Sequence, residues 1–238
     1  MILSHKHKLV LFKPIKVGGS SVELAFSNHC GPNDVLTGTD LVEEKEIGYR
    51  AQNNQNPRYH THTSPDIFFQ MTGEKFKDYH KVSIVRNPWD LAVSYFWWSY
   101  YGPENSFYPD LRPYESDDSD DLKKKFSEFV NCRASFANTA ASPGKNVTMP
   151  IVSWLASRTL EYYPQEIDRI LKFETLQADY NCLCEDLGTP SHELPRLKTS
   201  QRKSSIHYSE YYDAWSRSAV RRTFFSLIER FQYKFDDI

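Results

Sequence analysis

Apolar residues along the chain fall into short continuous runs, each followed by a stretch in which they recur at helical spacing. Runs of this length are typical of strands buried on both faces. The predicted strands are residues 8–12, 81–86 and 167–173. The predicted helices are residues 20–28, Pro88 to about Tyr100, one beginning near Leu122, Thr175 to Gly188, and a single last helix over about 209–232. Strands that alternate with helices indicate an α/β fold with parallel strands in one sheet.

The first predicted strand leads into a loop with two adjacent glycines, Lys16-Val17-Gly18-Gly19-Ser20-Ser21. Ser20 and Glu23 match a capping box, so a helix is expected to begin at once. The N–H groups at such a helix start bind phosphate-like anions, although a tight turn alone would also use glycine for a positive φ. A nucleoside-triphosphatase P-loop needs its lysine after the glycines, and Lys16 precedes them. The loop therefore indicates an anion site or a tight turn, and argues against an ATPase.

The second predicted strand ends in Arg86, and the next helix carries Ser94. Asn87 suits the N-cap of that helix, and Pro88 suits its first position. An arginine at a strand end and a serine two turns along the following helix can grip one phosphate. Taken alone, the pair is more often an ordinary surface Arg and a helix Ser.

Two histidines lie close together in His60-Thr61-His62-Thr63-Ser64-Pro65. If the segment is extended, both imidazoles point the same way and a metal pair is conceivable, but no third ligand stands at a supporting spacing. A histidine that takes a proton from a hydroxyl is the competing interpretation, because its pKa lies near working pH. A hydrogen-bonded loop histidine is the third.

Composition narrows the class of protein. With 238 residues, 39% hydrophobic and 15% aromatic, the chain is expected to fold as one domain over residues 1–238 with a ring-rich core. The charges nearly cancel, 29 basic against 31 acidic, which argues against a nucleic-acid binder but leaves room for a local anion site. The four cysteines show no zinc spacing, and no apolar run suits a membrane span or a secretory signal. We therefore expect a soluble cytoplasmic protein.

In this order, the motifs resemble the PAPS-dependent sulfotransferases, specifically the group whose first loop reads Pro-Lys-Thr-Gly-Gly-Thr-Ser and which acts on carbohydrates and small molecules. Ile15 and Val17 replace the Pro and first Thr of that loop, while Lys16 and residues 18–21 match by identity or hydroxyl. Residues 85–90 and Ser94 match the 3′-phosphate motif, and residues 231–235 resemble the end of the family's last helix. The resemblance spans nearly the whole chain and implies a P-loop-like three-layer fold, with a central mainly parallel sheet flanked by helices.

The resemblance also implies roles for individual residues. The amides and hydroxyls of Gly18, Gly19, Ser20 and Ser21 would hold the 5′-phosphosulfate of PAPS, with Lys16 beside the bridging oxygen where charge develops. Arg86 and Ser94 would bind the 3′-phosphate. His62 would be the base, with His60 as the fallback, and no metal is expected. Lys198 and Arg202, in a basic loop without acids, would close over the nucleotide.

The expected reaction is transfer of a sulfuryl group from PAPS to a hydroxyl of a small metabolite or sugar, giving PAP and a sulfate ester. Neither nucleic acid nor membrane is expected as a partner. The alternatives are an ATP-dependent phosphotransferase and a non-catalytic nucleotide-binding protein on the same scaffold. Residues 31–57 and 102–121 match no family motif and are expected to shape the acceptor site. Within the second of these segments, the acidic residues 115–121 are predicted to be a solvated loop.

Overall fold

The computed structural model describes residues 1–37, 59–101, 119–136, 147–197 and 206–235. The chain divides into two units. The first is made of Met1–Arg86 and Thr159–Leu197, and the second of Asn87–Arg158 and Lys198–Ile238. Each unit is described by itself.

The first unit is built on a five-stranded sheet with the strand order β3-β1-β2-β4-β7. Its strands are β1 (Ile2–Ser4), β2 (Leu9–Leu11), β3 (Val35–Leu36), β4 (His80–Val85) and β7 (Arg169–Lys172). β2 pairs with β4, and β4 with β7, in parallel, with Val10 opposite Lys81 and Ile84 opposite Leu171. β1 runs antiparallel to both β2 and β3, so the other four described strands share one direction.

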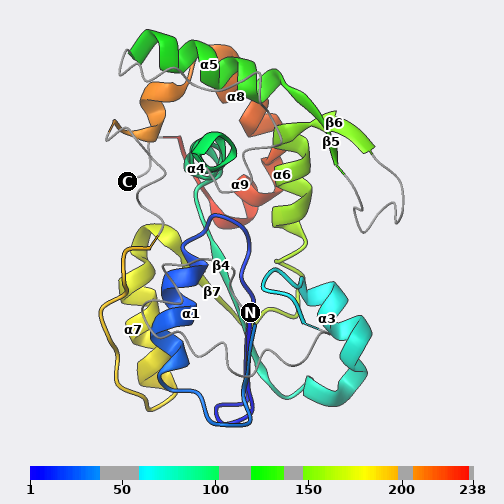
Figure 1. Cartoon of the computed structure of the whole chain (residues 1–238), viewed down its shortest axis with the longest axis vertical. Coiled ribbons are helices and arrows are strands. Elements are labelled where there is room, and N and C mark those ends of the chain that lie inside the picture. The colour runs from blue at the N-terminus through cyan, green and yellow to red at the C-terminus, as the bar shows by residue number, and fades with distance from the viewer. Residues whose placement is uncertain (38–58, 102–118, 137–146, 198–205, 236–238) are drawn as a thin grey trace. The chain divides into compact units, whose positions relative to one another are not determined.

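Helices cover both faces of this sheet. α1 (Gly19–Ser27) and α7 (Leu176–Asp186) lie on one face, and α3 (Pro65–Thr72) lies on the other (Figure 1). Short 3-10 turns, η2 (Gly73–Phe76) and η4 (Phe173–Thr175), follow α3 and β7. The α/β class, with a mainly parallel sheet flanked by helices, is confirmed, and β2, β4 and β7 each lie within a predicted strand or one residue outside it.

The strand β1 was missing from the sequence prediction. Its three residues are too few to show a period, so its extended form depends on the pairing with β2 and β3. Asp34 ties the connecting turn down, because its carboxylate accepts from the Ser4 hydroxyl at 2.7 Å and from the His5 N–H at 2.7 Å. Tertiary contacts therefore decide the structure of this segment.

The second unit is mostly helical among its described residues. It contains α4 (Pro88–Tyr101), α5 (Ser119–Asn131), α8 (Ala214–Thr223), α9 (Phe225–Phe231) and the 3-10 turn η6 (Tyr208–Tyr211). A hairpin of β5 (Arg133–Phe136) and β6 (Val147–Pro150) precedes α6 (Ile151–Leu160), whose last two residues belong to the first unit. The predicted ring-rich core is present here: Phe96, Phe126, Phe129 and Tyr211 pack with ring centroids 5.3–6.3 Å apart.

Asn87 caps α4 as predicted, since its Oδ1 accepts from the Trp89 N–H at 3.0 Å. Two other predictions are wrong. The single last helix is broken into η6, α8 and α9, because Asp213 and Ser216 form a capping box that starts α8 and Phe224 leaves helical geometry at ψ 18°. The loop predicted over 115–121 ends earlier, because Ser119, Asp120 and Asp121 form the first turn of α5, where acidic groups meet the positive end of the helix dipole.

Candidate active site

The glycine loop joins β2 to α1 in the first unit, as predicted. Gly18 is the N-cap residue of α1 and has φ 77°, a left-handed conformation that strains any residue with a Cβ. A Cβ at Gly18 would also lie 3.0 Å from carbons of Phe173 and Leu176. The tight-turn interpretation is therefore correct, and it places the start of α1 against η4 and α7.

The first turn of α1 presents backbone N–H groups. The Ser21 N–H donates to the Gly18 carbonyl at 3.1 Å, while the amides of Gly18 and Gly19 have no hydrogen-bond partner within the described part of the chain. Such groups, together with the positive end of the helix dipole, attract an anion. Gly18, Gly19, Ser20 and Ser21 are therefore brought to one helix start.

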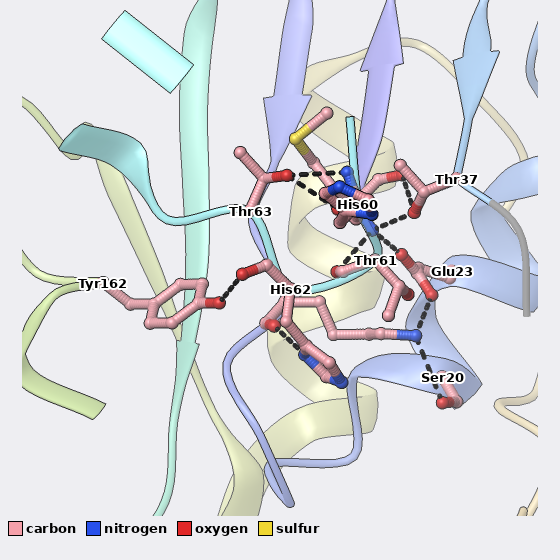
Figure 2. Close-up of polar contacts among 10 residues, drawn as sticks. Ser20, Glu23, Thr37, His60, Thr61, His62, Thr63 and Tyr162 are labelled. Carbon is pink, nitrogen blue, oxygen red and sulfur yellow. Dashed lines mark hydrogen bonds and ion pairs between the residues drawn. The ribbon is translucent and has the colours of Figure 1, made fainter. Parts of the chain in front are cut away.

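The capping box predicted for Ser20 and Glu23 is not formed, because α1 has no side-chain cap. Glu23 is instead buried and pairs with the Lys13 ammonium and the Met1 nitrogen (Figure 2). Burial raises the pKa of Glu23, but the charges and hydrogen bonds of Lys13 and the Met1 amino group outweigh it, so the pKa lies below its ordinary value. Glu23 therefore forms a buried ion pair with Lys13 and does not cap the start of α1.

Lys16 lies in the turn before Gly18 with φ 58°, a left-handed conformation that is uncommon for a lysine. Its carbonyl oxygen accepts a hydrogen bond from Nη1 of Arg86 at 2.7 Å. The loop and the end of β4 are thus joined through these two residues.

Arg86 follows the last residue of β4 and is buried, with 8% of its surface exposed. Its guanidinium carbon lies 3.9 Å from the centroid of the Phe173 ring, a cation–π contact. Phe173 thus packs against both the arginine and the glycine turn, a role that sequence reasoning missed although it placed Phe173 at a strand end. Ser94, the predicted partner of Arg86, is a partly exposed residue of α4 in the second unit.

The segment of the two histidines is a turn, so the extended conformation suggested for it is wrong. The Thr63 N–H donates to the His60 carbonyl at 3.0 Å, which places Thr61 and His62 at the centre of the turn. His62 is half-buried, and its Nδ1 lies 2.8 Å from the carbonyl oxygen of Lys13 (Figure 2). His60 is exposed. Of the two candidate bases, His62 is the one that contacts the segment leading into the glycine loop.

The His62 ring is held in a position that favours its neutral form. The Tyr162 hydroxyl donates to the His62 carbonyl at 2.5 Å and so fixes the backbone of the turn. Burial, and after it the charge of Lys13, lower the pKa of the imidazole to about 4. The imidazole is therefore unprotonated at neutral pH, as a general base requires.

Several residues of the site were not predicted from sequence. Lys13, Glu23, Phe173 and Tyr162 all contact the predicted residues, but they lie outside the two motifs. The one sequence feature that could have indicated them is Lys13, which directly follows the predicted buried strand and precedes Lys16 by three residues. Lys198 and Arg202 lie outside the described residues, as do most of the segments expected to shape the acceptor site.

The described residues contain neither a metal-binding cluster nor a helix that could cross a membrane. No group of three or more His, Cys, Asp or Glu side chains in them is arranged to hold a metal ion. None of their helices has the length and apolar character needed to cross a membrane.

Comparison with known proteins identifies the chain. Neither the curated proteins nor the solved structures gave a match. A family model described as the sulfotransferase family matches residues 1–235. That range includes the glycine loop, the turn at His62 and Arg86, whose contacts given above lie in the first unit. This chain belongs to the sulfotransferase family.

Proposed function

We propose that this sulfotransferase uses PAPS as donor and transfers its sulfuryl group to a hydroxyl of a small metabolite or sugar, leaving PAP. Membership of the family supports sulfuryl transfer in general. The choice of donor is supported by one observation above all: two bonds from distant residues meet the segment that joins β2 to α1, from Arg86 to the Lys16 carbonyl and from His62 to the Lys13 carbonyl.

A donor with two anionic groups needs two sets of hydrogen-bond donors, and the start of α1 and Arg86 supply them. The amides of Gly18 and Gly19, which have no hydrogen-bond partner among the described residues, suit the 5′-phosphosulfate. The hydroxyls of Ser20 and Ser21 belong to the same helix turn. Arg86 donates from Nη1 to the Lys16 carbonyl, and its guanidinium carries five N–H donors in a planar fork whose geometry matches a phosphate. We assign Arg86 to the 3′-phosphate, with Ser94 as its partner from the sequence motif.

The reacting groups follow from the same arrangement. Lys16 stabilises the charge that develops on the bridging oxygen as the S–O bond breaks. His62, neutral at working pH, takes the proton of the attacking hydroxyl. Lys198 and Arg202 are retained as groups that close over the nucleotide, and no metal is assigned.

The family match extends over residues of both units, which supports the proposal that residues 1–238 form a single sulfotransferase domain. The cytoplasmic location stays a prediction from the sequence.

The acceptor class rests on the family resemblance. A screen of hydroxylated metabolites and saccharides with labelled PAPS would identify the acceptor.

Calorimetry with two nucleotides tests the donor site. Wild-type protein should bind PAP, and Lys16→Ala should abolish binding. Arg86→Ala should weaken PAP by about tenfold or more, since a charge-assisted hydrogen bond contributes about 1.5–3 kcal/mol. The same substitution should affect 5′-AMP far less, because 5′-AMP lacks the 3′-phosphate. Lys77→Ala, which removes an exposed lysine of the same unit, is the matched control.

Two results would count against the proposal. A wild-type protein that does not bind PAP excludes the donor, and an Arg86→Ala variant that loses PAP and 5′-AMP equally excludes the assigned role of Arg86. His62→Ala should keep its PAP affinity but lose turnover by about a hundredfold or more. An active His62→Ala variant would move the base elsewhere.

A further inference from the structure

Lys13 is a lysine in an unusual place. It lies two residues after β2 and has only 4% of its surface exposed, whereas lysines are almost never fully buried unless paired. Its ammonium pairs with the buried carboxylate of Glu23 and lies 3.4 Å from the Ser20 hydroxyl (Figure 2). The proposed function gives this side chain no role.

The stem of Lys13 is fixed as firmly as its ammonium. A Cβ at Gly19 would lie 2.3 Å from Cγ and 2.8 Å from Cδ of Lys13, so the side chain packs directly against the backbone of the first helix turn. Because the stem and the ammonium are both held, the charge of Lys13 has a defined position next to the anion-binding turn.

The backbone of Lys13 fixes the proton of His62. A carbonyl oxygen only accepts hydrogen bonds, so the 2.8 Å contact with the Lys13 carbonyl requires a proton on Nδ1 of His62. A neutral imidazole has one ring proton. The lone pair that can accept a proton from a substrate is therefore on Nε2.

Charges from three elements act on this ring. The Lys13 ammonium, from the segment after β2, and the Met1 amino group, next to β1, lower the pKa of His62, while the Glu23 carboxylate, from α1, raises it. Burial of the ring also lowers the pKa of His62, as the Lys13 ammonium does, and it is the largest of the causes. The hydrogen bond to the Lys13 carbonyl raises the pKa, so the carbonyl and the ammonium of Lys13 act in opposite directions. The charges of Lys13 and Glu23 also oppose one another at His62, although they form an ion pair.

Resting on the proposed function, we propose that Lys13 is a positioning residue for the base. Its carbonyl selects the Nδ1–H tautomer of His62, and its ammonium, held by Glu23, keeps the imidazole unprotonated until the donor binds. A dianionic donor at the first turn of α1 opposes the field of Lys13, so Nε2 becomes more basic once the donor is in place. The acceptor proton then passes to Nε2 as the new O–S bond forms, the S–O bond to the 5′-phosphate breaks and PAP leaves.

Titration of the His62 ring in ¹⁵N-histidine-labelled full chain tests the proposal, with the signal assigned by its loss in His62→Gln. The wild type should show protonated Nδ1, unprotonated Nε2 and a midpoint near pH 4. Lys13→Met keeps the carbonyl and the stem but removes the charge, so the midpoint should rise by about one unit. Glu23→Gln should move the midpoint in the opposite direction. Lys81→Met, which removes a lysine from β4 that is paired with Asp168, should leave it unchanged.

Each single variant leaves a buried charge with fewer partners and can therefore be unstable. The double variant Lys13→Met/Glu23→Gln removes both charges and serves as a control for this loss of stability. Its midpoint should lie between those of the single variants. In activity assays, the acid limb of kcat/KM should move to higher pH in Lys13→Met, while PAP still binds.

The outcomes separate the two proposals. Protonated Nε2, midpoints that shift in the same direction in Lys13→Met and Glu23→Gln, or an unmoved acid limb would each overturn the role of Lys13. A wild-type protein that shows the expected titration but binds no PAP would instead overturn the donor assignment, because the titration needs no nucleotide.

Discussion

Alanine at Gly19 tests whether the buried Lys13 side chain is as rigid as its contacts indicate. Gly19 has no positive φ and is the first residue of α1, so helix propensity alone would let alanine stabilise by no more than about 1 kcal/mol, the value for a helix interior. The new Cβ, however, would meet Lys13 Cγ at 2.3 Å, and the stem would have to retreat by about 1 Å to reach ordinary contact. Lys13 is held by Glu23 and by backbone on either side, so we expect this movement to break the ion pair.

The magnitude follows from that pair. Breaking a buried ion pair costs about 3–5 kcal/mol, and the gain in helix propensity offsets part of it, so Gly19→Ala should destabilise the first unit by about 3 kcal/mol. Gly188→Ala is the matched control, because its φ of 62° strains a new side chain while nothing lies within 4 Å of the Cβ. Its cost should be about 1–2 kcal/mol.

Urea unfolding followed by far-UV circular dichroism measures these changes. The method matters because all five tryptophans lie in the second unit, so tryptophan fluorescence reports on that unit. If Gly19→Ala is no less stable than Gly188→Ala, the Lys13 side chain yields to the new methyl group, and the rigidity argued for it is wrong.

Two further predictions concern pH and a helix start. On acidification from pH 6.5 to about 4, the unfolded chain binds a proton at His62 that the folded chain does not, so stability is lost over this window. The loss should reach at most about 3 kcal/mol, reduced by solvent screening at this half-buried ring, and urea unfolding of His62→Gln at pH 7 and pH 4.5 should show a smaller change than wild type. Asp213→Ala removes the α8 capping box and should cost about 1 kcal/mol in thermal unfolding, whereas Glu229→Ala, on exposed α9 surface, should cost less than half of that. Equal effects of the two substitutions would contradict the capping role.

The parts of the fold that the sequence predicted are those with a strong local signal. β4 and α4 follow from an apolar run and from Asn87-Pro88, whose cap geometry depends on neighbouring residues alone. The short strand β1 has no such signal, because pairing with β2 determines it. The position of the His62 ring has none either, because the Lys13 carbonyl and the Tyr162 hydroxyl, both distant in sequence, hold this residue. The break before α8 was visible as Asp213 with Ser216, but the apolar period across 209–232 concealed it.

The candidate site divides in the same way. The turn that contains Lys16, Gly18 and Gly19 was predicted because a loop motif is local in sequence, and the anion-binding role of these residues stays a proposal. The partners that hold this loop were not, since Phe173 approaches Gly18 from far along the chain and Glu23 satisfied a local pattern while bonding to Lys13. The sequence pattern suggested that Glu23 caps the helix in which it lies. In the structure it pairs with Lys13, because a buried charge needs a partner of opposite charge.

The bond from Arg86 to the Lys16 carbonyl has a consequence for which donors the protein accepts. On the proposed function, the residue that binds the 3′-phosphate is attached to the residue that acts at the sulfuryl end through one 2.7 Å hydrogen bond, and its guanidinium also lies 3.9 Å from the centroid of the Phe173 ring. The spacing between the two anion sites is then set by short, stiff contacts. A lysine at position 86, with a flexible stem and no planar fork, would no longer hold that spacing, so the protein would discriminate less between a 3′-phosphorylated donor and its isomers.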